Sequence, residues 1–285
     1  MASLKEVKGR IATVNNTRKI TSAMKMVASA KLHKAQGAIT NMLPYEGRLH
    51  KLLTHLLNGE EKFVWNTSKK VKRVALVVFS SNSSLCGGFN ANVIKHAIQW
   101  LDEYQELGKE NILIYPVGKK VADALSKMGY TIQGNFQHMA DKPSFAEAAG
   151  LAQELMDMFS LGEVDRIELL YNHFKSTASQ ILTREVYLPM QTSEKAKEQS
   201  DELDYILEPS GEELLAMLLP KVLRMKLYTV LLDSNASEHA ARTMAMQIAT
   251  DNADDLLQEL TLMYNKTRQQ AITNELLDIV GGSMA

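Results

Sequence analysis

The sequence predicts an α/β protein in which long helices at the two ends of the chain pair as one coiled coil. Three observations predict this fold: an apolar heptad repeat near each end, and an alternation of strand-like and helix-like segments between them. The expected units are an N-terminal coiled-coil helix over residues 1–58, an inserted α/β domain over 70–209 and a C-terminal coiled-coil helix over 210–285.

Residues 3–57 carry the first heptad stripe. Alternating steps of three and four from Leu4 to Leu56 visit sixteen positions, of which twelve are apolar. A stripe held this long is typical of a coiled coil rather than a short globular helix, and the helix would be about 80 Å long. Pro44 is expected to kink it, because a mid-helix proline loses one backbone hydrogen bond. The Asn-Gly pair at 58–59 is expected to end it.

Three polar residues interrupt this stripe in succession: Arg18, Thr21 and Lys25. Coiled-coil seams accept isolated polar residues, usually to fix the register of the helices. Three in a row predict instead that this segment faces something other than its partner helix.

The C-terminal segment has the same character. Neither Gly nor Pro occurs between Pro220 and Val280, and a Gly-Gly pair at 281–282 is expected to end the helix. Pro220 is tolerated at the first helical position, so residues 211–219 are expected to form a separate turn or lead-in. The predicted seam positions are Met246, Ala249, Ala253, Leu256, Leu260 and Met263.

The middle of the chain predicts an open, Rossmann-like α/β domain with right-handed crossovers, because short β-branched runs alternate with helical spacing. A polar stretch at 192–204 is expected to be a surface loop. Strands are expected over 73–80, 111–117, 165–174 and 180–188, and helices over 92–107, 119–128 and 144–159.

The formal net charge of −1 hides a split between the two ends. Residues 1–57 hold ten Lys/Arg and two Glu, which gives +8, whereas residues 210–285 hold six Lys/Arg and ten Asp/Glu, which gives −4. Two interpretations remain open: a basic arm for nucleic acid, or a basic helix beside an acidic one. The single cysteine, Cys86, excludes an internal disulfide and fits a reducing compartment, and no segment is apolar enough to span a bilayer.

The turn sequence SSNSSLCGGFN at 80–90 stands between a predicted strand and a predicted helix. It could cradle a phosphate, but it matches neither common phosphate-binding glycine motif and lacks a lysine at the helix start. Cys86 has no partner histidine nearby in sequence, and no CxxC pair suggests zinc. The acidic pairs at 212–213 and 254–255 are interpreted as solvated helix faces. We therefore expect no catalytic residue, no cofactor and no metal site.

Three collinear stretches resemble the gamma subunit family of the F-type ATP synthases. They are IATVNNTRKITSAMKMVASAK at 11–31, LCGGFN at 85–90 and YNKTRQQAITNELLDIVGG at 264–282. Residues 204–209 and 250–253 are also similar to this family. The chain departs from the family in two places: Asn-Ser-Ser at 82–84 replaces the usual Asp-Arg-Gly, and Ser283 replaces the usual alanine.

The resemblance implies that the terminal helices pair as an antiparallel coiled coil. It also implies a non-catalytic central rotor shaft that couples proton-driven rotation of the c-ring to conformational cycling of the catalytic sites on beta. Its implied partners are the alpha and beta subunits, the epsilon subunit and the c-ring, with no nucleic acid and no direct membrane span. Its implied place is peripheral, on the cytoplasmic face of the bacterial inner membrane. The resemblance assigns beta-subunit contacts to Met24, Lys25, Arg268, Gln269 and Thr273, and contacts of the foot with the c-ring or epsilon to Tyr205 and Glu208.

Two rival functions make different predictions. A small-molecule enzyme built on the α/β domain, with the helices as a dimerisation stalk, would bind its ligand at the turn near Gly87. A basic coiled-coil tether would bind nucleic acid through residues 1–57 with a strong salt dependence.

Overall fold

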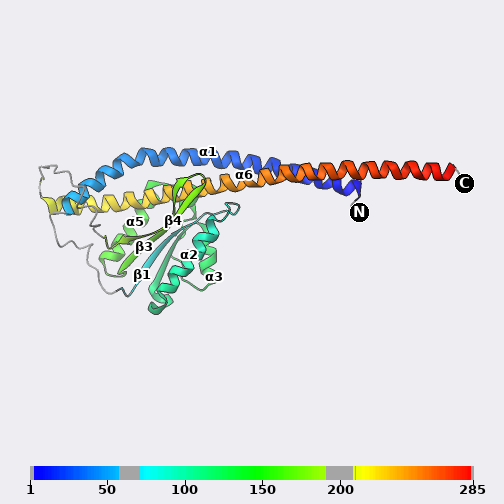
Figure 1. Cartoon of the computed structure of the whole chain (residues 1–285). Helices are drawn as coiled ribbons and strands as arrows, with labels where there is room; N and C mark the ends of the chain where they lie inside the picture. The colour runs from blue at the N-terminus through cyan, green and yellow to red at the C-terminus, as the bar shows by residue number, and fades with distance from the viewer. Residues whose placement is uncertain (1–2, 58–70, 191–207, 209, 284–285) are drawn as a thin grey trace.

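The computed structural model describes residues 3–57, 71–190, 208 and 210–283. Its two terminal helices, α1 (Leu4–Leu57) and α6 (Gly211–Ser283), lie side by side as an antiparallel shaft (Figure 1). At about 1.5 Å per residue, their lengths are roughly 80 and 110 Å. The predicted ends at 58–59 and the predicted loop at 192–204 lie outside the described residues.

Cross-helix contacts fix the register of the shaft. Arg18 contacts Asp254, and Thr21 contacts Thr250, so paired positions add to 271 or 272. The N-terminus of α1 therefore lies beside residue 268 or so, and the last fifteen residues of α6 extend about 20 Å beyond it. Figure 1 shows this end of α6 as a single unaccompanied helix.

The first predicted stripe is confirmed, because all of its sixteen positions are buried or half-buried. The second is partly wrong. Leu256 and Met263 are exposed, whereas the neighbouring Leu257 and Tyr264 are half-buried and face the seam with Leu260. Alternating steps of three and four can pass through either of two adjacent residues, here Leu256 or Leu257. Packing against the partner helix decides which of the two faces the seam.

Both helices continue through their prolines, and α1 bends in the half that holds Pro44 (Figure 1). The expected break before Pro220 is wrong, because α6 is helical from Gly211 onward. The reason is packing: Leu215, Leu219 and Leu223 are buried in one core with the inserted domain. This burial offsets the hydrogen bond lost at the proline.

The inserted domain contains a four-stranded sheet in the order β2-β1-β3-β4. The central strand β1 (Val74–Phe79) is parallel to β2 (Ile112–Val117) and to β3 (Arg166–Ser176), and β3 is antiparallel to β4 (Ser179–Leu188). All four predicted strands are confirmed. The predicted right-handed crossover is wrong for β3 and β4. Only two residues connect these strands, which permits only a hairpin.

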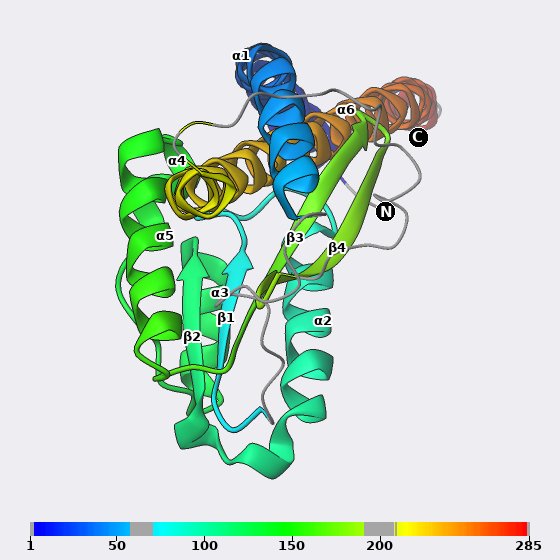
Figure 2. The same cartoon turned by 90° about the vertical axis from the view of Figure 1, so that its left-hand side faces the viewer.

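Helices cover both faces of this sheet (Figure 2). One face is packed by α2 (Phe89–Glu103) and α3 (Lys119–Lys127), and the other by α5 (Phe145–Ser160) together with α6. Two 3₁₀ turns (Gln105–Leu107 and Lys109–Asn111) and the short α4 (Gln137–Asp141) complete the domain. The shaft helix α6 is therefore also a core element of the domain that is inserted before it.

Candidate functional site

Three polar side chains in the middle of α6 bond the inserted domain through its backbone. Asp233 Oδ1 accepts the backbone N–H of Phe174 at 2.7 Å, and its Oδ2 lies 2.6 Å from His173 Nδ1. The other two donate to backbone carbonyls at 2.8 Å: Ser237 to that of Asn172 and Asn235 to that of Ala140. These bonds hold the ends of β3 and α4 against one stretch of the shaft.

Arg242 extends this set to the turn after β1. Its guanidinium donates to Ser83 Oγ at 2.9 Å and to the backbone carbonyl of Ser84, and it pairs with Glu238 at 2.8 Å. The side chains of Arg242 and Glu238 are each only 10% exposed. Glu238 holds the guanidinium of Arg242 in place on α6, and the bonds of Arg242 to Ser83 and Ser84 then tie the turn to the helix. We refer to Asp233, Asn235, Ser237, Glu238 and Arg242 together as the polar joint.

The electrostatics of the polar joint reflect its burial. Burial raises the pKa of Glu238 above its ordinary value, although the hydrogen bond and charge of Arg242 act against this rise. Burial lowers the pKa of the adjacent His239 to about 4, with the positive charges of Lys31 and Arg242 acting in the same direction. The imidazole is therefore neutral at physiological pH, and the polar joint has one tightly held ion pair at its centre.

The glycine turn singled out in the sequence packs against the shaft. A side chain added at Gly87, whose φ is +60°, would lie 3.8 Å from the Cβ of Ala245 on α6. Cys86 is buried in this turn and accepts a hydrogen bond from Asn90 Nδ2 at 3.1 Å. Leu85 has φ +69° and projects outward, 60% exposed. The turn is thus a structural connection to α6, and Cys86 is held as a packed thiol.

The usual ligand crevice of an open α/β sheet lies outside the carboxyl ends of its strands. Here α6 lies across that edge. The space left between Ser80, Val117 and Asn235 is about 10 Å³, which is room for roughly one water molecule. The carboxylate of Glu238 also lines it and would repel a phosphate. This geometry disfavours the nucleotide-binding alternative.

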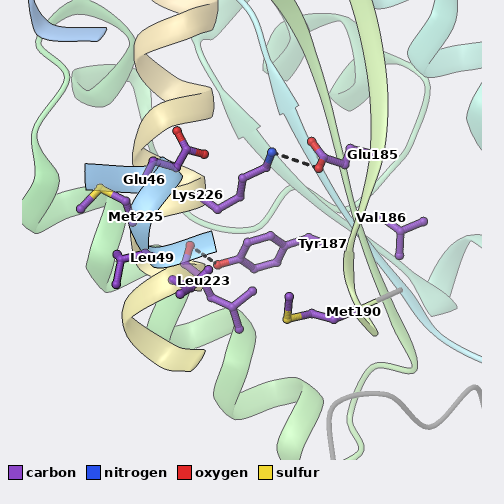
Figure 3. Close-up of a pocket in the computed structure, with 10 residues that line it drawn as sticks. Glu46, Leu49, Glu185, Val186, Tyr187, Met190, Leu223, Met225 and Lys226 are labelled. Carbon is purple, nitrogen blue, oxygen red and sulfur yellow. Dashed lines mark hydrogen bonds and ion pairs between the residues drawn. The ribbon is translucent and has the colours of Figure 1, made fainter. Parts of the chain in front are cut away.

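A larger cavity of about 180 Å³ lies where α1, β4 and α6 meet (Figure 3). Two contacts close its sides: Lys226 Nζ pairs with Glu185 at 3.0 Å, and Tyr187 Oη donates to the backbone carbonyl of Leu223 at 2.8 Å. Both contacts tie β4 to α6, so they extend the attachment of the domain along the shaft. The remaining lining is mostly apolar and includes Leu49 from α1.

A second group of charged side chains surrounds the buried Glu168 of β3, away from the polar joint. Glu168 pairs with Arg166 and Arg184 and accepts the hydroxyl of Tyr104 at 2.8 Å. Arg184 also stacks over Trp100, with its guanidinium carbon 4.6 Å from the ring centroid. Since its partners satisfy the carboxylate within the domain, we assign it to fold stability.

The predicted contact residues fall at two levels of the shaft. Met24 and Lys25 are half-buried on α1, at the level of residue 247 of α6. Arg268 is exposed on α6 at the level of the α1 N-terminus, and Gln269 and Thr273 are exposed on the unaccompanied end just beyond it. The two sets are roughly 30 Å apart along the axis, so the structure does not bring them together.

The other expected positions have mixed outcomes. Glu208 is exposed, and Tyr205 lies outside the described residues. The interpretation of Arg18 and Thr21 as facing away from the partner helix is wrong, because they bond Asp254 and Thr250 across the seam. The Arg18 side chain is long enough to reach Asp254 from the edge of the seam, and Thr21 is small enough to fit inside it, so the helices stay close.

Sequence reasoning missed the polar joint. A signal was present: the run SNASEHAAR at 234–242 places six polar residues in the middle of a long helix. Read as a helix face, that run predicts a polar partner surface.

Exposed apolar side chains gather on the unaccompanied end of α6. Ile272, Leu276, Leu277 and Ile279 are between 45% and 68% exposed. A concentration of this kind marks a contact surface for another protein. Within the described residues, no helix is long and apolar enough to cross a membrane, and no group of three His, Cys, Asp or Glu side chains is placed to hold a metal ion.

A family model and two curated relatives match this chain over nearly its whole length. The family model described as ATP synthase matches residues 3–285. The ATP synthase gamma chains of Phocaeicola vulgatus and Bacteroides fragilis are 68% and 62% identical, each over the whole of both chains.

Two solved structures share the fold. A chain of the Euglena gracilis mitochondrial ATP synthase (OSCP/F1/c-ring) has a TM-score of 0.65 at 21% identity, with 99% of this chain and 93% of that chain covered. A chain of the Tetrahymena thermophila mitochondrial ATP synthase central stalk and c-ring has a TM-score of 0.58 at 23% identity, with 81% and 99% covered.

Proposed function

The chain belongs to the ATP synthase family, among its gamma chains, and we propose that torque passes through it along one defined path from the inserted domain to α6. It is the central rotor shaft of an F-type ATP synthase and has no active site of its own. One observation carries the proposed path: α6 is a single 73-residue helix that begins in the core of the domain and ends as the free tip of the shaft.

The path begins at the foot. The domain is bonded to α6 by the polar joint and by the contacts of Glu185 and Tyr187 with the shaft. Several such bonds at different heights oppose both sliding and twisting of the domain about the helix. We therefore propose that rotation of the domain by the c-ring turns α6 directly, with the epsilon subunit as a further partner at the foot.

The upper shaft acts on the ring of alpha and beta subunits. An asymmetric rod that contacts one beta subunit more favourably than the others shifts the conformational populations of that subunit. We propose beta contacts at two levels, with Met24 and Lys25 at the lower level and Arg268, Gln269 and Thr273 at the tip. The cations at both levels suit acidic surfaces on beta.

We propose the three chain units over residues 1–58, 70–209 and 210–285, with one qualification from the packing. The first part of α6 is a core helix of the α/β domain and also one of the two helices of the coiled coil. The complex that contains this chain is the peripheral F1 portion, and we propose that it lies on the cytoplasmic face of the bacterial cell membrane. The bacterial sources of the similar gamma chains support this location.

Co-purification tests the proposed function. A tagged chain should bring down the alpha and beta subunits in excess over itself, together with epsilon, from membranes of a complemented strain. Isothermal titration of the isolated chain should show no tight ATP binding. Recovery of the chain without alpha and beta, or micromolar ATP binding, would refute the shaft function.

The contact assignment has its own test. Replacing Arg268 and Gln269 by alanine should lower ATP-driven proton pumping or assembly, because both side chains are exposed and available to beta. Lys266→Ala on the same exposed helix is the matched control. Thermal unfolding of the double variant should match that of the parent, and equal pumping by all three proteins would contradict the assignment.

A further inference from the structure

In the part of the chain that the structure describes, the side-chain bonds of the domain to the shaft are with α6. Among the described side chains, every hydrogen bond and ion pair between the shaft and the domain involves α6. α1 packs on the domain through apolar side chains such as Leu53 and Leu56, and Glu46 acts on Tyr171 through its charge alone. If the domain turns α6, then α1 turns because α6 carries it.

Two polar contacts join α1 to α6 at one level of the shaft. Arg18 Nη1 donates to Asp254 Oδ1 at 2.9 Å, and the hydroxyls of Thr21 and Thr250 lie 2.9 Å apart. Thr21 is buried in the seam. In the part of the shaft that the structure describes, these are the only side-chain hydrogen bonds between the two helices.

The apolar packing around this level identifies the register poorly. Alanine is the commonest buried apolar residue from 28 to 35 on α1 and from 236 to 253 on α6. Five of the seven buried apolar residues are alanine, and the other two are Leu32 and Met246. Alanine side chains present nearly the same small shape at every turn. Within this stretch, a slip of one heptad would mostly exchange one alanine contact for another, whereas the two polar pairs form in one register only.

We propose that Arg18, Thr21, Thr250 and Asp254 are positioning residues that fix the axial register of α1 on α6. They thereby set the height at which α1 presents Met24 and Lys25. The link between this register and coupling rests on the proposed shaft function. The register itself is a property of the chain and is measurable separately.

The test uses the full chain and the assembled complex. The variant combines Thr21→Val, Thr250→Val and Arg18→Ala, which removes both contacts and keeps the size of the threonines. Glu6→Ala with Arg10→Ala is the matched control, because it removes an ion pair that lies wholly within α1. Spin labels on cysteines at the exposed positions Ser29 and Gln258, in a Cys86→Ser background, are separated mainly along the shaft axis and report the register by electron–electron distance.

A slip of one heptad moves α1 by about 10 Å, which is well resolved by this measurement. The fraction of molecules in which α1 is displaced by one heptad should rise about tenfold in the variant, because one hydrogen bond and one ion pair are lost. Proton pumping per ATP hydrolysed should fall about twofold or more while ATP hydrolysis continues. The reversed pair Arg18→Asp with Asp254→Arg should restore both readouts relative to Arg18→Asp alone.

Three results would overturn the proposal: an unchanged distance distribution in the triple variant, equal changes in the Glu6/Arg10 control, or a shifted register with unchanged pumping. Failure of the shaft function itself would look different, because the parent chain would then fail to support pumping at all.

Discussion

Replacing Arg242 by alanine should destabilise the inserted domain by about 3–5 kcal/mol, the usual cost of removing one partner of a buried ion pair. The structure gives the reason. The Arg242 side chain is 10% exposed and binds both Glu238 and the turn at Ser83 and Ser84. Its loss leaves a buried carboxylate without its cation and frees the turn from α6.

The deficit should depend on pH. Burial raises the pKa of Glu238 in the folded protein, so the protonated carboxyl favours folding. That contribution is full below the unfolded pKa and is lost as the pH rises through the folded pKa. Because Arg242 lowers the pKa of Glu238, its removal raises that pKa further. The variant should therefore lose more stability near pH 7.5 than near pH 5.

Urea unfolding followed by the fluorescence of the buried Trp100, in a Trp65→Phe background, measures the free energy of unfolding. Adding Glu238→Gln to the Arg242→Ala variant should recover part of the loss, since no buried charge then remains. The control is Arg10→Ala, which breaks an exposed pair and should cost under about 1 kcal/mol. Equal deficits at both pH values, or no recovery with Glu238→Gln, would refute this reasoning.

Two further predictions concern other parts of the chain. Gly118→Ala should cost about 3 kcal/mol or more in chemical unfolding, because its φ is +112° and the new Cβ would lie 2.2 Å from the backbone oxygen of Ser80. Gly9→Ala, in a helix with no atom within 4 Å of the new Cβ, should instead stabilise by about 0.5–1 kcal/mol, and similar effects at both glycines would contradict the steric argument. Burial lowers the folded-state pKa of His239 to about 4 from 6.5, so its stability contribution is present above pH 6.5 and is lost as the pH falls toward 4. His239→Gln should reduce the loss of unfolding free energy in acid by up to about 3 kcal/mol, measured by urea unfolding at several pH values. An unchanged pH profile would contradict the lowered pKa of His239.

The sequence was sufficient for the four strands, the longer helices and the fold class. The stripe from Leu4 to Leu56 predicts the buried face of α1 because a helix repeats its faces by local geometry. The strands were predictable for the same reason, as β-branched runs fill a buried sheet. The short connection between residues 176 and 179 already implied the β3–β4 hairpin, although the strand–helix alternation hid it.

The sequence by itself determined two long heptad helices around an α/β domain, because helical period and strand composition are local properties of the chain. Only the tertiary structure decided that Leu257 rather than Leu256 faces the seam, that Arg18 and Thr21 bond across it, and that α6 joins the core of the domain. Those outcomes depend on the axial register of two helices whose bonded residues are more than 200 positions apart in sequence. A local pattern defines each face, but the surface that covers it is supplied by a distant part of the chain.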